Sequence, residues 1–160
     1  MKKVAVLMGS DSDLPVLKGC FTTLKNFSVP YEAHVYSAHR TPYEAAEFAQ
    51  NAKKNGFGVI IAAAGKAAHL AGAMAAQSVL PIIGIPVQAT ALDGMDALLS
   101  TVQMPAGIPV ATVAINGSEN AALLAIEMLA ISDDTLYEKL IAFREEQRQA
   151  VLTKNAKLDV

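Results

Sequence analysis

Three short segments carry the side chains with the clearest chemical potential. Residues 9–13 read GSDSD, residues 37–42 read SAHRTP and residues 63–69 read AAGKAAH. An imidazole titrates near working pH, so His39 could transfer a proton, and the adjacent Arg40 offers a planar fork of donors to an anion. A histidine next to an arginine in one loop seldom lacks a functional role, and this pair indicates a binding or catalytic site.

Each segment also has a purely structural interpretation. Residues 9–13 could form a strand-to-helix turn in which Ser12 or Asp13 caps the helix, whereas free backbone N–H groups at the same helix start would bind an anion. Residues 37–42 could be no more than a capped helix start. Residues 63–69 could be a tight turn that favours packing, or the small-residue wall of a pocket. The sequence weighs the two interpretations of the first and third segments equally.

The elements that must position these segments alternate along the chain. Short apolar runs, each too short for a helix and bounded by turn residues, predict five strands. These strands cover residues 3–8, 30–36, 58–63, 82–86 and 109–115. Apolar residues at helical spacing, with prolines in two first turns, predict helices between the strands. These helices cover about residues 15–27, 42–54, 68–78, 93–103 and 119–131. A last helix, capped by Ser132 or Asp133, should extend to about residue 153.

Strands that alternate with helices and are uniformly apolar favour a parallel sheet covered on both faces. We therefore predict an α/β protein, with one three-layer α/β/α domain over residues 1–160 and a flavodoxin-like, parallel five-stranded sheet. Because parallel strands point their carboxyl ends to one edge, the three polar segments should meet there. The last helix has no strand to return to. We expect an extended C-terminal helix that packs on another subunit.

Composition excludes several classes of protein. The chain carries 13 basic and 15 acidic residues, and a net charge of −2 gives no field to attract nucleic acid. A single cysteine excludes an intrachain disulfide framework. The apolar run near the N-terminus is too short for a secretory signal, so we expect a cytoplasmic protein. Residues 67–92 hold no charge, but prolines interrupt them, and we expect no membrane span. The low charge and 29 alanines favour self-association.

Several common chemistries lack their motifs. The chain contains no GxGxxG of dinucleotide sites, no GxxxxGK[ST] of nucleotide triphosphate sites and no GxSxG elbow of a hydrolase. A receiver-type phosphoacceptor would need an aspartate and a lysine where Ala63 and Asn116 stand. His39 and His69 have no clear third ligand beside them, so we expect no metal site.

Five segments together resemble one family of purine biosynthesis. They read MGSDSDL (8–14), YSAHRTP (36–42), AAGKAAHLAG (63–72), LPIIGIPVQ (80–88) and STVQMPAGIPVATVAI (100–115). Over about residues 3–131 the chain resembles the N5-carboxyaminoimidazole ribonucleotide mutase, or PurE, family. SAHRTP combined with QMPxGIPVATVAI is highly specific, whereas GSxSD alone is not.

The resemblance implies an isomerase that converts N5-carboxyaminoimidazole ribonucleotide to 4-carboxy-5-aminoimidazole ribonucleotide by carboxylate transfer to C4. It also implies a homo-octamer with sites between subunits and no cofactor. It makes His39 the catalytic acid–base residue, and Ser10, Asp13 and Arg40 match the family's substrate-binding positions. The same pocket would be lined by Ser12, Ser37, Gly65 and His69.

Two departures from the family pattern fall in the third segment, where Lys66 stands for a glycine and Ala71 for a proline. Two other functions are alternatives. One is the class of the same family that carboxylates aminoimidazole ribonucleotide directly with CO2, and the other is a non-catalytic flavodoxin-like module that binds a flavin or nucleotide. Arg40, Pro42 and His69 favour the mutase over the direct carboxylase.

Overall fold

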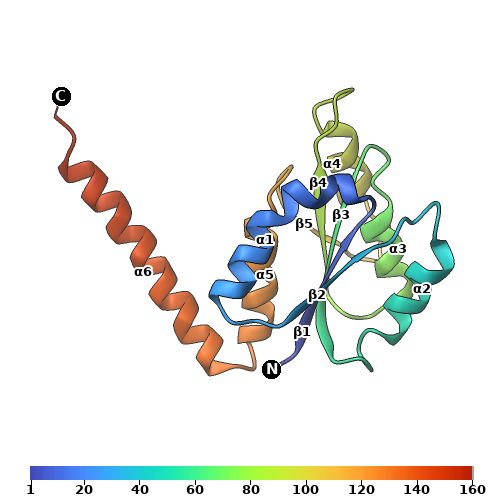
Figure 1. Ribbon diagram of the computed structural model, residues 1–160, viewed down its shortest axis with the longest axis horizontal. Helices are drawn as coiled ribbons and strands as arrows, with labels where there is room; N and C mark the ends of the chain where they lie inside the picture. Colours follow the sequence, from blue (N-terminus) through green and yellow to red (C-terminus); the bar gives the residue numbers. More distant parts are fainter. Residues whose placement is uncertain (160) are drawn as a thin grey trace.

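The computed structural model describes residues 1–159, which contain one five-stranded sheet (Figure 1). All strand pairs are parallel, and the order across the sheet is β2-β1-β3-β4-β5. This flavodoxin-like order confirms the predicted fold class. The strands are β1 (Lys3–Met8), β2 (Tyr31–Val35), β3 (Phe57–Gly65), β4 (Ile82–Val87) and β5 (Ala111–Thr112).

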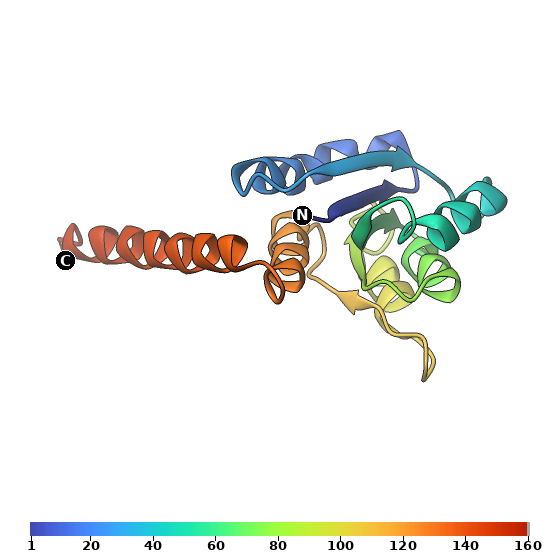
Figure 2. The same cartoon turned by 90° about the horizontal axis from the view of Figure 1, so that it is seen from below.

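Helices cover the two faces of the sheet (Figures 1 and 2). One face carries α1 (Leu14–Asn26), which follows a single 3₁₀ turn, and α5 (Ser118–Ala130). The opposite face carries α2 (Pro42–Asn51), α3 (Leu70–Gln77) and α4 (Met95–Val102). Three layers are therefore present, as predicted.

The alternation of side chains along the strands divides the core into two. In β1, Val4 and Val6 are buried against α1 and α5, while Ala5 and Leu7 are buried on the side of α2 and α3. Central strands buried on both faces must be apolar throughout, which is why they read as continuous apolar runs. The edge strand β2 departs from this expectation, since most of its residues are exposed.

The last strand is much shorter than the predicted 109–115. Only its two residues pair with β4. It lies at the sheet edge with one neighbour, and Pro109 lacks the N–H that a ladder needs. One further bond, from the Val113 N–H to the Gly84 carbonyl at 3.1 Å, keeps the chain beside β4.

Four predicted helices differ by two residues or more at one end, and the last of them ends at Ala156, three residues after the expected residue 153. α2 ends at Asn51, before the expected residue 54, and α3 begins at Leu70, two residues later than expected. α4 begins at Met95, because Asp93 and Gly94 have φ angles of 50° and 90° that a right-handed helix excludes.

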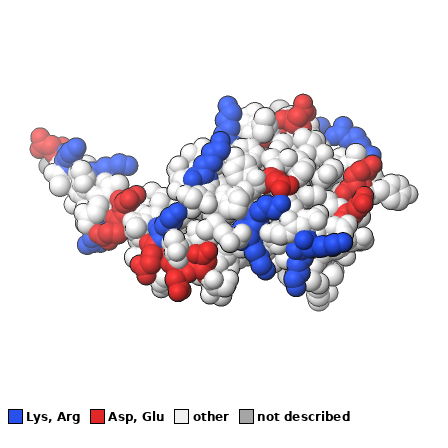
Figure 3. All heavy atoms as spheres, turned by 60° about the horizontal axis from the view of Figure 1, so that its bottom comes forward, with Lys and Arg blue, Asp and Glu red and all other residues white. Residues whose placement is uncertain are grey.

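The last helix, α6 (Asp134–Ala156), projects away from the body of the molecule (Figures 1 and 2). Its cap is Asp133, whose Oδ1 accepts a hydrogen bond from the Leu136 N–H at 3.1 Å. Leu136 and Leu140 are buried against α5, whereas every residue of the helix from Arg144 onward is exposed. Figure 3 shows acidic and basic side chains mixed along this arm. Within residues 1–159, no helix is both long and apolar enough to cross a membrane.

A glycine in β4 permits the close packing of α4. A Cβ on Gly84 would lie 2.3 Å from Thr101 Cγ2 and 3.1 Å from Val110 Cγ1. We expect Gly84→Ala to lower the free energy of unfolding by about 1–3 kcal/mol, because overpacking forces the neighbours apart. Denaturant unfolding at a fixed protein concentration measures this change.

Thr101→Ser supplies the matched control, since serine lacks Cγ2 but keeps the hydroxyl that donates to the Ala97 carbonyl at 2.7 Å. The double variant should recover much of the lost stability. A Gly84→Ala protein as stable as the parent would contradict this account of the packing.

Candidate active site

The three polar segments meet at the carboxyl edge of the sheet, around a cavity of about 710 Å³. They follow β1, β2 and β3, and the residues after β4 complete the lining. Every site residue predicted from the sequence lies on this cavity: Ser10, Ser12, Asp13, Ser37, His39, Arg40, Gly65 and His69. The expected convergence of the three segments at one edge of the parallel sheet is thus confirmed. It establishes where these residues lie and does not assign a catalytic or binding role to any of them.

The loop after β1 is held by its own polar groups. The Gly9 N–H donates to the Ala63 carbonyl at 3.0 Å, which ties the loop to the end of β3. Ser10 Oγ accepts from the Ser12 N–H at 3.3 Å, and the Ser10 N–H donates to Asp13 Oδ2 at 3.2 Å. This reciprocal capping box makes Ser10 the cap of the 3₁₀ turn. Asp13 occupies the N-cap position of α1 as one interpretation expected, but its side chain makes no capping bond to that helix and accepts from the Ser10 N–H instead.

The loop after β2 is organised around Ser37. Its Oγ accepts from the His39 N–H at 3.3 Å and from the Arg40 N–H at 3.2 Å. Thr41 Oγ1 accepts from the Ser37 N–H at 2.8 Å and donates to the Ser37 carbonyl at 3.1 Å. The backbone beneath the imidazole and the guanidinium is therefore fixed by two hydroxyl groups.

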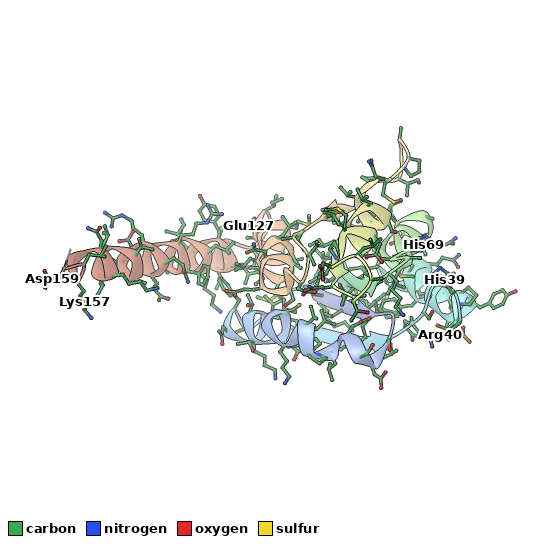
Figure 4. The ribbon with its side chains drawn as sticks, turned by 90° about the horizontal axis from the view of Figure 1, so that it is seen from above. His39, Arg40, His69, Glu127, Lys157 and Asp159 are labelled. Carbon is green, nitrogen blue, oxygen red and sulfur yellow. The ribbon has the colours of Figure 1, made fainter. Side chains whose placement is uncertain are left out.

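His39 and His69 contact each other, although 30 residues separate them. His39 Nε2 lies 2.8 Å from His69 Nδ1, and the rings meet edge to face. Figure 4 shows both histidines with Arg40 at the end of the molecule opposite the tip of α6. One of the two facing nitrogens must carry the proton of this hydrogen bond, so the pair can pass or share a proton.

Arg40 connects the second loop to the first. Its Nη2 donates to the Gly9 carbonyl at 3.3 Å, and the side chain is exposed on the cavity. A guanidinium has five N–H donors, so this single bond leaves others for a ligand. The serine hydroxyls of the first loop lie on the same cavity, and together these groups suit an anion such as a phosphate.

The loop after β3 is built from small residues. A Cβ at Gly65 would lie 3.1 Å from the Val87 carbonyl oxygen, so glycine allows β3 and β4 to stay close at the rim. Lys66 follows with a φ of 56°, the left-handed conformation that the missing glycine of the family pattern would adopt freely. His69 comes next on the cavity as the residue that precedes α3.

Sequence reasoning missed the contribution of the segment after β4. Gln88 lines the cavity, and its N–H donates to Asn116 Oδ1 at 2.9 Å. Asn116 Nδ2 donates back to Gln88 Oε1 at 3.2 Å. The signal was available, because Gln88 ends the LPIIGIPVQ segment at the same edge of the sheet.

The site contains one carboxyl group with a shifted pKa, that of Asp13. Burial raises the pKa of the Asp13 carboxyl, and hydrogen bonds from the Ser10 and Gly9 backbone only partly offset this effect. Within residues 1–159, no three histidine, cysteine, aspartate or glutamate side chains are grouped so that they could hold a metal ion.

The raised pKa of Asp13 gives stability a specific pH dependence. A carboxyl whose pKa is higher in the folded than in the unfolded chain favours folding when protonated, and this contribution is lost as pH rises through the folded pKa. We expect Asp13→Asn, which cannot ionise, to gain free energy of unfolding relative to the parent as pH rises from about 4 to neutrality. Chemical denaturation across this range at constant protein concentration tests the sign. Asp159→Asn, at the exposed C-terminal end, is the control for the loss of one carboxyl group outside the site.

Comparison with known proteins gives a consistent result. The AIR carboxylase family matches residues 3–150. An N5-carboxyaminoimidazole ribonucleotide mutase from Pyrococcus abyssi is 54% identical over 93% of this chain and 86% of its own length. A phosphoribosylaminoimidazole carboxylase from Saccharomyces cerevisiae is 51% identical over 98% of this chain, which spans 27% of that protein. The crystal structure of Treponema denticola PurE covers 98% of each chain, with a TM-score of 0.89 and 26% identity. The chain belongs to the AIR carboxylase family.

Proposed function

We propose that this protein is an N5-carboxyaminoimidazole ribonucleotide mutase, an isomerase of purine biosynthesis. The observation that carries the proposal is the contact between His39 and His69 in a cavity that also holds Arg40. The site combines a proton-transfer group with an anion-binding group, which is what an acid–base reaction on a phosphorylated ring requires. Relatives about half identical to the chain bear the mutase name.

The reaction needs one proton to be given and one to be taken back. When the bond between the exocyclic nitrogen and its carboxylate breaks, CO2 leaves and the nitrogen takes up a proton. The nucleophilic C4 then attacks CO2, and loss of the C4 proton restores the aromatic ring. We assign both transfers to His39, with His69 as the hydrogen-bonded partner that holds its ring. Carbamates lose CO2 readily, so this chemistry does not require a cofactor.

The other cavity residues suit binding of the ribotide. Arg40 and Ser10 can donate to the phosphate, while the Asp13 carboxylate can accept from a ribose hydroxyl. Ser12, Ser37 and Gly65 would complete the binding site, with Ser37 also supporting the catalytic loop. The alanines around Lys66 leave room for CO2 beside the ring.

One alternative has a specific observation in its favour. Relatives from yeast and plants, 50–51% identical to this chain, are named phosphoribosylaminoimidazole carboxylases. We therefore keep direct carboxylation of aminoimidazole ribonucleotide as the second candidate. Conversion of the N5-carboxylated ribotide without added bicarbonate supports the mutase. Turnover only with aminoimidazole ribonucleotide and bicarbonate would support the carboxylase. A non-catalytic flavin- or nucleotide-binding module has no support among the relatives, which are named as enzymes.

We also propose that residues 1–160 act as one domain within a cytoplasmic homo-octamer. Apolar side chains remain exposed on α6, where nothing within residues 1–159 covers them. These include Tyr137 and Ile141 beside the contact with α5, and Val151 and Leu152 further along the arm. Burial of such side chains between subunits would favour association.

The catalytic assignment predicts unequal effects of two similar substitutions. Asparagine is close in size to histidine but cannot shuttle a proton. We expect His39→Asn to lower kcat by roughly 10²–10⁴-fold while the ribotide still binds, whereas His69→Asn should keep a measurable fraction of activity. Steady-state assays with separate measurement of ribotide affinity test both variants. Substantial activity in His39→Asn, with none in His69→Asn, would reverse the assignment.

The assembly proposal predicts a mass of about eight times 16.8 kDa in solution. Light scattering at micromolar concentration measures this mass. Ile141→Asp with Val151→Asp should shift the protein to smaller species, since a charge on each exposed apolar position opposes burial. Glu146→Lys, on an exposed and polar part of the same helix, is the control for a change of charge alone. A monomeric parent protein would exclude the octamer.

A further inference from the structure

Lys66 occupies an unusual backbone conformation at the edge of the cavity. Its φ of 56° lies in the left-handed region, which disfavours residues with a Cβ and which glycine adopts without strain. The side chain is exposed, lines the cavity and forms no hydrogen bond or ion pair with the residues 1–159. A strained residue that offers a free cation to a ligand cavity calls for a functional explanation.

One arginine and one lysine line the cavity, and they come from different loops. Arg40 follows β2 and is anchored on the Gly9 carbonyl, next to the serines of the first loop. Lys66 follows β3, which β1 separates from β2 in the sheet. Adjacent strands are about 4.8 Å apart, so the two loops leave the sheet about 10 Å from each other. The cavity can therefore hold a ligand with two separate anionic groups.

This inference rests on the proposed function. The carboxylated ribotide carries a phosphate at one end and a carboxylate at the ring. The carboxylate is joined to C4 in the product, and C4 exchanges its proton with His39. His39 contacts His69, which lies three residues after Lys66 in the same loop. The carboxylate end of the ligand thus belongs beside the third loop, and the phosphate beside Arg40.

We propose that Lys66 binds the carboxylate of the carboxylated ribotide. The protein would thereby bind this ribotide in preference to ribotides whose imidazole ring carries no carboxylate. The ammonium group forms an ion pair with the carboxylate on nitrogen in the substrate and with the carboxylate on C4 in the product. Lys66 is a positioning and specificity residue, since it takes no part in the proton transfers of His39.

Two ribotides that differ in a single charge test this role. The ligands are 4-carboxy-5-aminoimidazole ribotide and its 4-carboxamide analogue, and calorimetry measures their dissociation constants. Lys66→Met keeps the approximate length of the side chain and the strained backbone conformation, but it removes the charge. We expect this variant to bind the carboxylate about tenfold more weakly and the carboxamide within about twofold of the parent. Lys66→Arg should keep the preference for the carboxylate.

Two further variants separate binding from folding. Lys54→Met removes a lysine from the turn before β3, at the opposite edge of the sheet, and should leave both affinities unchanged. Lys66→Gly removes the charge and also the backbone strain. It should raise the thermal midpoint and yet lose the preference for the carboxylate, a combination that a purely structural lysine would not produce.

An equal loss of affinity for both ribotides in Lys66→Met would overturn the inference, because the lysine would then act on the shared part of the ligand. Unchanged affinity for the carboxylate would overturn it as well. If the unaltered protein binds neither ribotide, the proposed function fails and the role of Lys66 with it. That outcome is recognised in the parent, before any variant is compared.

Discussion

The parallel pairing of β1 with β2 on one side and β3 on the other is the constraint on which the site depends. Met8 pairs with Val35 and with Ala63, so β1 and β2 end at the same level and β3 continues two residues further, to Gly65. The Gly9–Ala63 hydrogen bond extends this alignment one residue beyond β1. Residues placed a few positions after each strand therefore share one cavity, whatever their separation in the chain. A slip of one residue between β1 and β3 would turn the buried side chains of one strand to the opposite face, and the packing of both strands in the core opposes it.

The loops above the sheet are ordered by short polar side chains. Ser10 and Asp13 form a capping box in the first loop. In the second loop, Thr41 Oγ1 accepts from the Ser37 N–H, and Ser37 Oγ accepts from the His39 and Arg40 N–H groups. These bonds fix the backbone of both loops, so less conformational entropy is lost when a ligand binds. The residues with the larger functional groups, His39 and Arg40, stand on a backbone that is already fixed. The third loop differs, because it reaches its conformation through glycine and through strain at Lys66.

Small residues let the layers approach closely. Ala45 and Ala49 of α2 and Ala71 of α3 are buried against the sheet. Gly84 has no side chain that would collide with Thr101 of α4. The core of a single chain is compact for this reason, but α6 is only half included in it. The proposed octamer would complete the burial that the single chain leaves unfinished on this helix.

The sequence alone determined the fold class and which polar residues after β1, β2 and β3 line the cavity. Strand and helix patterns are local, and parallel topology sends every strand end to one edge, so Ser10, His39 and Gly65 could be placed together without coordinates. Tertiary structure decided what depends on contacts between loops. The pairing of His39 with His69, the anchoring of Arg40 on Gly9 and the hydrogen bonds between Gln88 and Asn116 each require a distance between segments remote in the chain. The short β5 and the exposed β2 depend on position at a sheet edge, because an edge strand has one neighbour and less burial, and the order of strands across the sheet is a tertiary property.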